Sequence, residues 1–408
     1  MNLARYFSFP STLPKELKSN FILLFWDIAW WGLYAGATAS FLTIYATRCG
    51  ATPEQIGWLT AAPAVISLAL SLPAGRLLKR VPVTRATVIS AFLSRIFFLA
   101  YALLPWLFPV ERQVIAILAL AAIITIPTTI INISFSQFFM EAVPPDWRGT
   151  VAGVRIAIFS IVSFIATVVS GEILTRMTFP SGYQVVFMLG FIGGIMTVAQ
   201  LIRVRPFHFQ EMLPVAPEEE PVRKSKLGSE GRHYFKVLGL LFLFNTTNNM
   251  VAPLVPDLLV HKLNLSDGVI SIGTATSSML VFLVSASVIQ ITRQVGNRKA
   301  TAVGAMLLSL NAVALSLAQD VTLYMAAAVI GGISSGILGA AQYNYHLENV
   351  PKMDQPTWLS WALLVGNAAI LLGALAGPFL AGLTGAPSAL ILFGVLRLAA
   401  GLLILKWG

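Results

Sequence analysis

Residues 113–139 read QVIAILALAAIITIPTTIINISFSQFF, and this stretch decides the fold class of the chain. It contains 27 residues, none of them charged. A helix rises about 1.5 Å per residue and the hydrocarbon core of a bilayer is about 30 Å thick, so about 20 apolar residues can cross it. The stretch also lacks the alternation, over about ten residues, of an outer-membrane barrel strand. It therefore predicts a membrane-spanning α-helix.

Eleven further apolar runs of similar length lie on both sides of this stretch. The twelve predicted spans are residues 20–47, 55–74, 86–108, 113–139, 150–174, 183–202, 234–260, 269–291, 301–317, 321–342, 358–383 and 388–405. All have the continuous apolar pattern of helices, because a lipid-exposed backbone must satisfy its own hydrogen bonds. The sequence thus predicts an all-α membrane protein with twelve transmembrane helices.

The composition excludes other classes of protein. Hydrophobic residues make up 57% of the 408 positions and charged residues only 11%, whereas a soluble domain carries about 25% charged residues. A chain this poor in charge cannot cover its surface with polar groups in water, so it is neither a soluble globular domain nor a disordered segment.

The basic residues predict the orientation of the spans. With the N terminus inside, the cytoplasmic segments hold 20 Lys and Arg residues and the outer segments hold four. By the positive-inside rule, we expect both termini in the cytoplasm. The net charge of +10 then reflects topology and contact with lipid headgroups, and it does not require nucleic acid as a partner.

The predicted domains are residues 1–19, a cytoplasmic N-terminal segment; 20–204, a six-helix bundle; 205–233, a cytoplasmic linker rich in proline and charge; and 234–408, a second six-helix bundle. The two bundles resemble each other in sequence. A shift of 214 residues places Ile56 on Ile270 and Arg85 on Lys299. Six spans, an even number, separate the copies, so both have the same orientation in the membrane.

Two short segments resemble motifs of the major facilitator superfamily (MFS). Gly75, Arg76 and Lys79 match part of that family's loop between spans two and three. Arg148 and Gly149, after a run of prolines, match its loop after span four. The resemblance covers essentially the whole chain. It implies two pseudo-symmetric six-helix bundles, transport by alternating access, and cytoplasmic gating loops that contain Gly75, Arg76, Arg148 and Gly149.

In this family the first and fourth helices of each half line a central cavity, and those are the helices that carry polar stripes here. A polar stripe on a span indicates a face that meets water or a substrate, with hydrogen bonding between helices as the alternative. Pro253 and Pro256 follow the amides of the seventh span and predict a kink there. The substrate-binding candidates are Asp27, Trp31, Tyr34, Thr38, Asn132, Asn245, Asn248, Asn249 and Gln342.

Five ionisable residues fall clearly within spans and are candidates for mechanism: Asp27, Arg95, Arg155, Glu172 and Arg397. Asp27 and Arg155 lie at similar depths, and we expect them to pair, since burying either charge alone would cost several kcal/mol. Asp27 is then a proton carrier, a static partner of Arg155, or a group that recognises a cationic substrate. For Arg95 and Arg397 an anion site is one interpretation, and contact with backbone carbonyls is the favoured one.

We therefore expect a secondary active transporter of a small organic molecule, working by proton-coupled efflux. The alternative is an MFS-fold protein with a uniport, lipid-handling or sensory role and no proton coupling. No spacing of histidine, cysteine or acidic residues indicates a metal site, an enzyme site or a cofactor. The expected partners are the substrate, protons and membrane lipids, and the expected state is a monomer in a bacterial cytoplasmic (inner) membrane.

Overall fold

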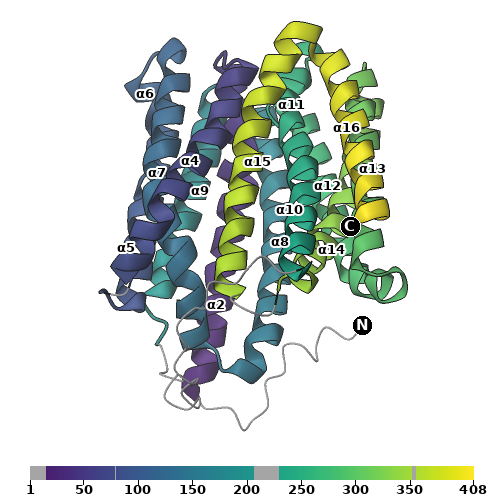
Figure 1. Cartoon of the computed structure of the whole chain (residues 1–408). Coiled ribbons are helices and arrows are strands. Elements are labelled where there is room, and N and C mark those ends of the chain that lie inside the picture. The colour runs from purple at the N-terminus through teal and green to yellow at the C-terminus, as the bar shows by residue number, and fades with distance from the viewer. Residues whose placement is uncertain (1–14, 79, 206–228, 352–354) are drawn as a thin grey trace. The chain divides into compact units, whose positions relative to one another are not determined.

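The computed structural model describes residues 15–78, 80–205, 229–351 and 355–408. Residues 1–14 of the predicted N-terminal segment and residues 206–228 of the predicted linker lie outside the described part. Every regular element in the described ranges is a helix (Figure 1). The structure thus confirms the all-α fold.

The helices occupy the predicted spans. In the first half they are α2 (Lys15–Tyr34), η1 (Ala35–Ala39), α3 (Ser40–Arg48), α4 (Pro53–Leu78), α5 (Val83–Ile96), α6 (Phe98–Leu107), α7 (Val110–Ala142), α8 (Pro145–Arg176) and α9 (Ser181–Leu201). In the second half they are α10 (Ser229–Val251), α11 (Leu254–Asp257), η3 (Leu258–Lys262), α12 (Asp267–Val295), α13 (Asn297–Leu317), α14 (Val321–Glu348), α15 (Gln355–Thr384) and α16 (Ala386–Trp407).

Eleven helices among the described residues are long and apolar enough to cross a membrane. The helix α4, with 26 residues, lies at the second predicted span. The chain is an integral, multi-pass membrane protein.

Three spans depart from a regular α-helix, and one of them, the third span, is interrupted at Phe97 between α5 and α6. In the first span, the five-residue π-helix η1 joins α2 to α3, and the Ser40 hydroxyl donates to the Ala35 carbonyl oxygen over 2.9 Å. In the seventh span, α10 ends at Val251 and the helix resumes at Leu254, directly after Pro253. Proline cannot donate to the helical ladder, and this interruption lies where the sequence predicts a kink.

Contacts divide the chain into two compact units. Unit 1 consists of Met1–Leu42 and Ile66–Glu218, and unit 2 of Thr43–Val65 and Glu219–Gly408. In unit 1, α2 packs against α8 and α9, and α5 packs against α7 and α9. In unit 2, α10 packs against α15 and α16, and α13 packs against α14 and α16. The same helix pairs recur in both units, as the repeat in the sequence predicts.

Unit 2 includes the C-terminal end of the first span and the first half of α4. Ile44 of α3 lies in one buried cluster with Leu254, Leu258 and Phe393. The glycines of α15 allow α10 to approach closely, because a Cβ at Gly377 would meet the Met250 carbonyl oxygen. This close contact seats the interrupted seventh span against α15.

Candidate functional site

Unit 1 contains a cavity of about 230 Å³ whose wall includes three charged side chains. Asp27 comes from α2, Arg95 from α5 and Arg155 from α8. The other lining residues are Ile28, Trp31, Thr128, Ile131, Asn132, Phe135 and Leu201. The structure therefore brings together the predicted residues Asp27, Trp31, Asn132 and Arg155. Two arginines and one aspartate give the wall a formal charge of +1.

Arg155 and Asp27 face each other in this cavity. Their side chains are about nine-tenths buried, and Arg155 Nη2 lies 3.1 Å from Asp27 Oδ2. Arg155 Nη1 also donates to the Leu24 carbonyl oxygen over 3.0 Å, and the guanidinium lies 4.9 Å from the centre of the Phe135 ring. A buried ion pair is tolerated when further contacts satisfy its remaining donors, as they do here for Arg155.

Arg95 is the third charge of the cavity, and the favoured expectation for it, contact with a backbone carbonyl, is present as a long contact of 3.5 Å from Nη1 to the Ala91 carbonyl oxygen. Its Nε donates to the Thr197 hydroxyl over 3.0 Å, and its Nη1 donates to the Ser94 hydroxyl over 2.7 Å. The guanidinium carbon lies 4.7 Å from the centre of the Trp31 ring. Arg95 is therefore held by neutral hydroxyls and an aromatic face, with 6% of its surface exposed. The feature of the sequence that pointed to Arg95 was that its own helix carries no acidic residue to pair with it.

A second, more apolar cavity of about 390 Å³ shares part of this wall. It adds the aromatic rings of Phe139 and Phe159 to those of Trp31 and Phe135. The charged cavity thus adjoins an aromatic surface in the same unit.

Two predicted residues of the first span line none of the cavities described here. Tyr34 stacks on Phe98, with ring centres 4.1 Å apart. Thr38 is fully buried in η1, and a Cβ at Gly190 of α9 would meet its hydroxyl. These two side chains serve helix packing in this structure, and the Thr38 hydroxyl has no hydrogen-bond partner, so for Thr38 the structure shows neither a cavity face nor the hydrogen bonding between helices that was the alternative.

Unit 2 contains two polar cavities, of about 300 and 370 Å³, that share Gly339 and Gln342. The amides Asn245, Asn248, Asn249 and Gln342 all line one or both, so the structure brings the predicted amides together. Gln342 Nε2 of α14 donates to Asn245 Oδ1 of α10 over 3.3 Å. The site is thus built where the first and fourth helices of the second half meet.

Arg397 of α16 also lines the larger cavity of unit 2. Its Nη1 and Nη2 donate to the carbonyl oxygens of Leu308 and Asn248, over 3.2 and 2.9 Å. The expected contact with backbone carbonyls is therefore present. The same guanidinium also reaches a cavity, which the favoured interpretation of the sequence did not include.

The predicted gating residues lie in helices and not in loops. Gly75 and Arg76 belong to the last turn of α4, and Arg148 and Gly149 to the first turns of α8. Arg148 donates to the carbonyl oxygens of Val143 and Met140, over 3.1 and 2.9 Å, so it caps the end of α7. Their gating role stays a prediction.

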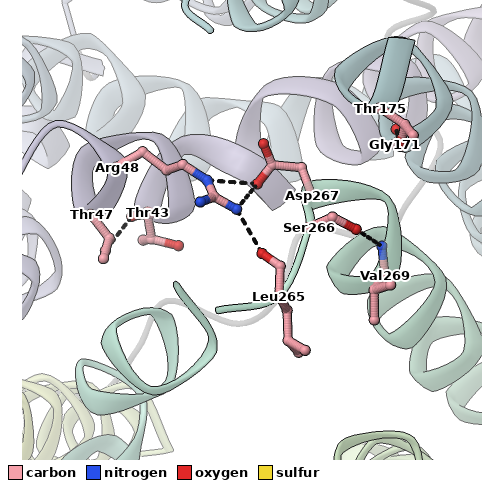
Figure 2. A network of polar contacts seen from close by, with 9 residues as sticks. All are labelled: Thr43, Thr47, Arg48, Gly171, Thr175, Leu265, Ser266, Asp267 and Val269. Carbon is pink, nitrogen blue, oxygen red and sulfur yellow. Dashed lines mark hydrogen bonds and ion pairs between the residues drawn. The ribbon is translucent and has the colours of Figure 1, made fainter. Parts of the chain in front are cut away.

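Arg48 and Asp267 form an ion pair that the sequence did not indicate. Arg48 Nε and Nη2 lie 3.0 and 2.9 Å from Asp267 Oδ1, and Nη2 also donates to the Leu265 carbonyl oxygen over 2.8 Å. Figure 2 shows the guanidinium between these acceptors. Within unit 2, this pair ties the end of α3 to the first turn of α12.

Substitution Arg48→Asp is expected to lower the free energy of unfolding by about 1–3 kcal/mol, since hydrogen bonds to charged groups are lost and two acids then face each other. The double variant Arg48→Asp, Asp267→Arg is expected to regain part of that loss. The exposed pair Glu172 and Arg176 supplies the control: Glu172→Gln should change stability by less than about 0.5 kcal/mol. Denaturation in detergent measures all three, and a double variant no more stable than Arg48→Asp would contradict a direct pair.

Comparison with known proteins identifies the architecture. A family model described as Major Facilitator Superfamily matches residues 21–236 and 237–408. A D-xylose–proton symporter is 14% identical, with a TM-score of 0.73, over 96% of this chain and 98% of that chain. A bacterial homologue of the iron transporter ferroportin, in its inward-facing state, is 12% identical, with a TM-score of 0.73, over 95% and 98%.

The nucleoside transporter NupG is 14% identical, with a TM-score of 0.63, and the likeness covers 97% of this chain and 100% of that chain. At these identities the likeness to solved structures shows the fold alone. A search of the curated proteins finds no match.

Proposed function

Because the chain belongs to the major facilitator superfamily, we propose that it is a secondary active transporter that moves a small organic molecule by alternating access. One observation carries the proposal: each unit holds a polar cavity built on the first and fourth helices of its half. These are α2 and α7 in unit 1, and α10 and α14 in unit 2. Transporters made of repeats bind their substrates in such cavities near the bilayer midplane.

The substrate we propose is amphipathic. In unit 1, the charged cavity adjoins the aromatic surface formed by Trp31, Phe135, Phe139 and Phe159. A ligand site that joins a large apolar surface to a few polar groups suits a molecule with an aromatic or aliphatic body and a polar group. We propose that this molecule is moved outward.

Proton exchange is proposed to drive this movement through Asp27. Within the described part of the chain, Asp27 is the only acidic residue in the wall of the four cavities. Its partner Arg155 lies 3.1 Å away, so protonation of the carboxyl group would free the guanidinium for another contact. A change in charge at this position can therefore alter what the cavity binds.

The test is reconstitution in liposomes that contain a fluorescent pH indicator, with a panel of amphipathic compounds added outside. Wild-type protein is expected to couple compound movement to proton movement, and Asp27→Asn is expected to reduce that proton flux by about tenfold or more. Compound exchange without a gradient should persist in Asp27→Asn. Glu111→Gln, at an exposed acid, is the matched control and should behave like wild type.

If compound movement is unaffected by both the pH gradient and the Asp27→Asn substitution, proton coupling is contradicted and uniport is favoured. Binding of compounds without any movement would favour the lipid-handling or sensory alternative.

We further propose a monomer in a bacterial cytoplasmic membrane, surrounded by lipid, with both termini in the cytoplasm. The distribution of 20 basic residues in the predicted inner segments against four in the outer ones supports this orientation.

A further inference from the structure

Arg397 carries a buried charge that no acid compensates within the described residues. Arg397 lies in the middle of α16, and only 2% of its surface is exposed. Two backbone carbonyl oxygens, of Leu308 and Asn248, accept from its terminal nitrogens. Its Nε has no hydrogen-bond partner. The described ion pairs all lie elsewhere in the chain.

Burying this charge costs free energy, and helix packing by itself does not explain why the charge is kept here. A guanidinium has five N–H donors, and an isolated charge that is removed from water loses several kcal/mol of solvation. Arg155 of unit 1 has Asp27 to offset that cost, whereas Arg397 has only neutral carbonyl groups. A site that keeps an uncompensated cation within a membrane span is by default a site for function.

The cavity beside Arg397 has the composition of an anion site. Its volume is about 370 Å³, within the range of small-molecule pockets. The polar side chains that line it with Arg397 are Asn248, Asn249, Asn311, Ser335 and Gln342, and none is acidic. Amide and hydroxyl groups can donate to an anionic oxygen, and the arginine fork matches carboxylate and phosphate in particular.

We propose that this cavity binds a carboxylate or phosphate group, with Arg397 as its charge partner. The proposal rests on the proposed function and deepens it, because it gives the transported molecule an anionic group. A membrane potential that is negative inside favours outward movement of such an anion by about 2.3 kcal/mol per charge per 100 mV. An anionic lipid headgroup has the same chemistry, so the experiment separates the two sources.

Binding is measured without transport, by thermal stability of the purified full chain in nanodiscs of phosphatidylcholine at constant ionic strength. The probes are inorganic phosphate and two matched pairs: benzoate with benzamide, and glucose 6-phosphate with glucose. A parallel series replaces part of the phosphatidylcholine by phosphatidylglycerol. At least one anionic probe, or the anionic lipid, should stabilise the protein at about tenfold lower concentration than its neutral counterpart.

Substitutions of Arg397 test whether stabilisation by anions depends on this residue. Arg397→Gln is expected to weaken the anion effect by about tenfold or more, while Arg397→Lys keeps part of it. Arg293→Gln, which removes an exposed charge of α12, should leave it unchanged. If Arg397→Gln does not fold, Arg397→Lys and mutual displacement of phosphate and benzoate on wild-type protein supply the measurement.

Equal stabilisation by anionic and neutral members of each pair, with no effect of phosphatidylglycerol, would overturn the proposal. So would an anion effect that survives in Arg397→Gln. An effect of phosphatidylglycerol alone would identify the ligand as a lipid headgroup, and an effect of solutes would identify it as a solute. Anion binding without movement of any compound would retain the anion site and count against the transport function.

Discussion

Substitution Asp27→Ala is expected to abolish proton-coupled transport and to lower the free energy of unfolding by about 3–5 kcal/mol, because it removes the proposed proton carrier and leaves Arg155 buried without its acid. Arg155 has 8% of its surface exposed and cannot turn to water. The Leu24 carbonyl oxygen and the faces of Phe135 and Phe139, none of which is charged, would remain as contacts. Transport in liposomes and denaturation in detergent measure the two effects.

The pair is tested by a double-mutant cycle of Asp27→Asn and Arg155→Gln. The double variant should be more stable than the sum of the two single losses implies, since neither charge is then left alone. Stability should change little in Glu111→Gln, an exposed acid in the first turn of α7. Additive losses in the cycle would mean that the two side chains, 3.1 Å apart, do not act as a pair.

Substitution Gly377→Ala is the second change for which we expect a large effect. Here the added Cβ would meet the carbonyl oxygen and Cα of Met250 in α10, and four residues earlier Gly373 approaches the Thr246 carbonyl oxygen in the same way. Backbone atoms cannot move aside as a flexible side chain can. We expect a loss of about 2–3 kcal/mol or more, together with loss of transport, because α10 carries Asn248 and Asn249.

Gly382→Ala is the matched control on the same helix, since a Cβ there has no neighbour within 4 Å. It should leave transport unchanged and alter stability by less than about 1 kcal/mol, in the direction of stabilisation, because alanine favours the helix. Fluorescence-detected gel filtration after heating compares the two variants. If both behave alike, close approach of α10 is not the reason for glycine at position 377.

Several features of this protein could be predicted from short stretches of sequence. A span depends on the length and polarity of its own residues, so the run at 113–139 predicted α7. The break in the seventh span followed from Pro253, which cannot donate to a helical ladder. The amides Asn248 and Asn249 line one cavity, and Asn245 lines the cavity that adjoins it, because the three are close neighbours on one helix.

Features that depend on helix packing could not be predicted in this way. Tyr34 and Thr38 follow the same stripe as Asp27 and Trp31, yet they lie against Phe98 and Gly190. Arg48 and Asp267 are separated by 219 positions, and no local pattern relates them. Which face of a helix meets a cavity depends on the rotation and depth of its neighbours, which the periodicity of one helix does not contain.

The sequence by itself determined the number, length and polarity of the spans, their repeat in two halves, and the match in depth between Asp27 and Arg155. The tertiary structure alone decided that Arg95 joins the cavity of Asp27, and that Arg397 reaches a cavity without an acid. The physical reason is that the requirement for apolar length acts on each helix separately. The surroundings of a buried charge are instead set by several helices at once, and here they decide which buried arginine forms an ion pair and which do not.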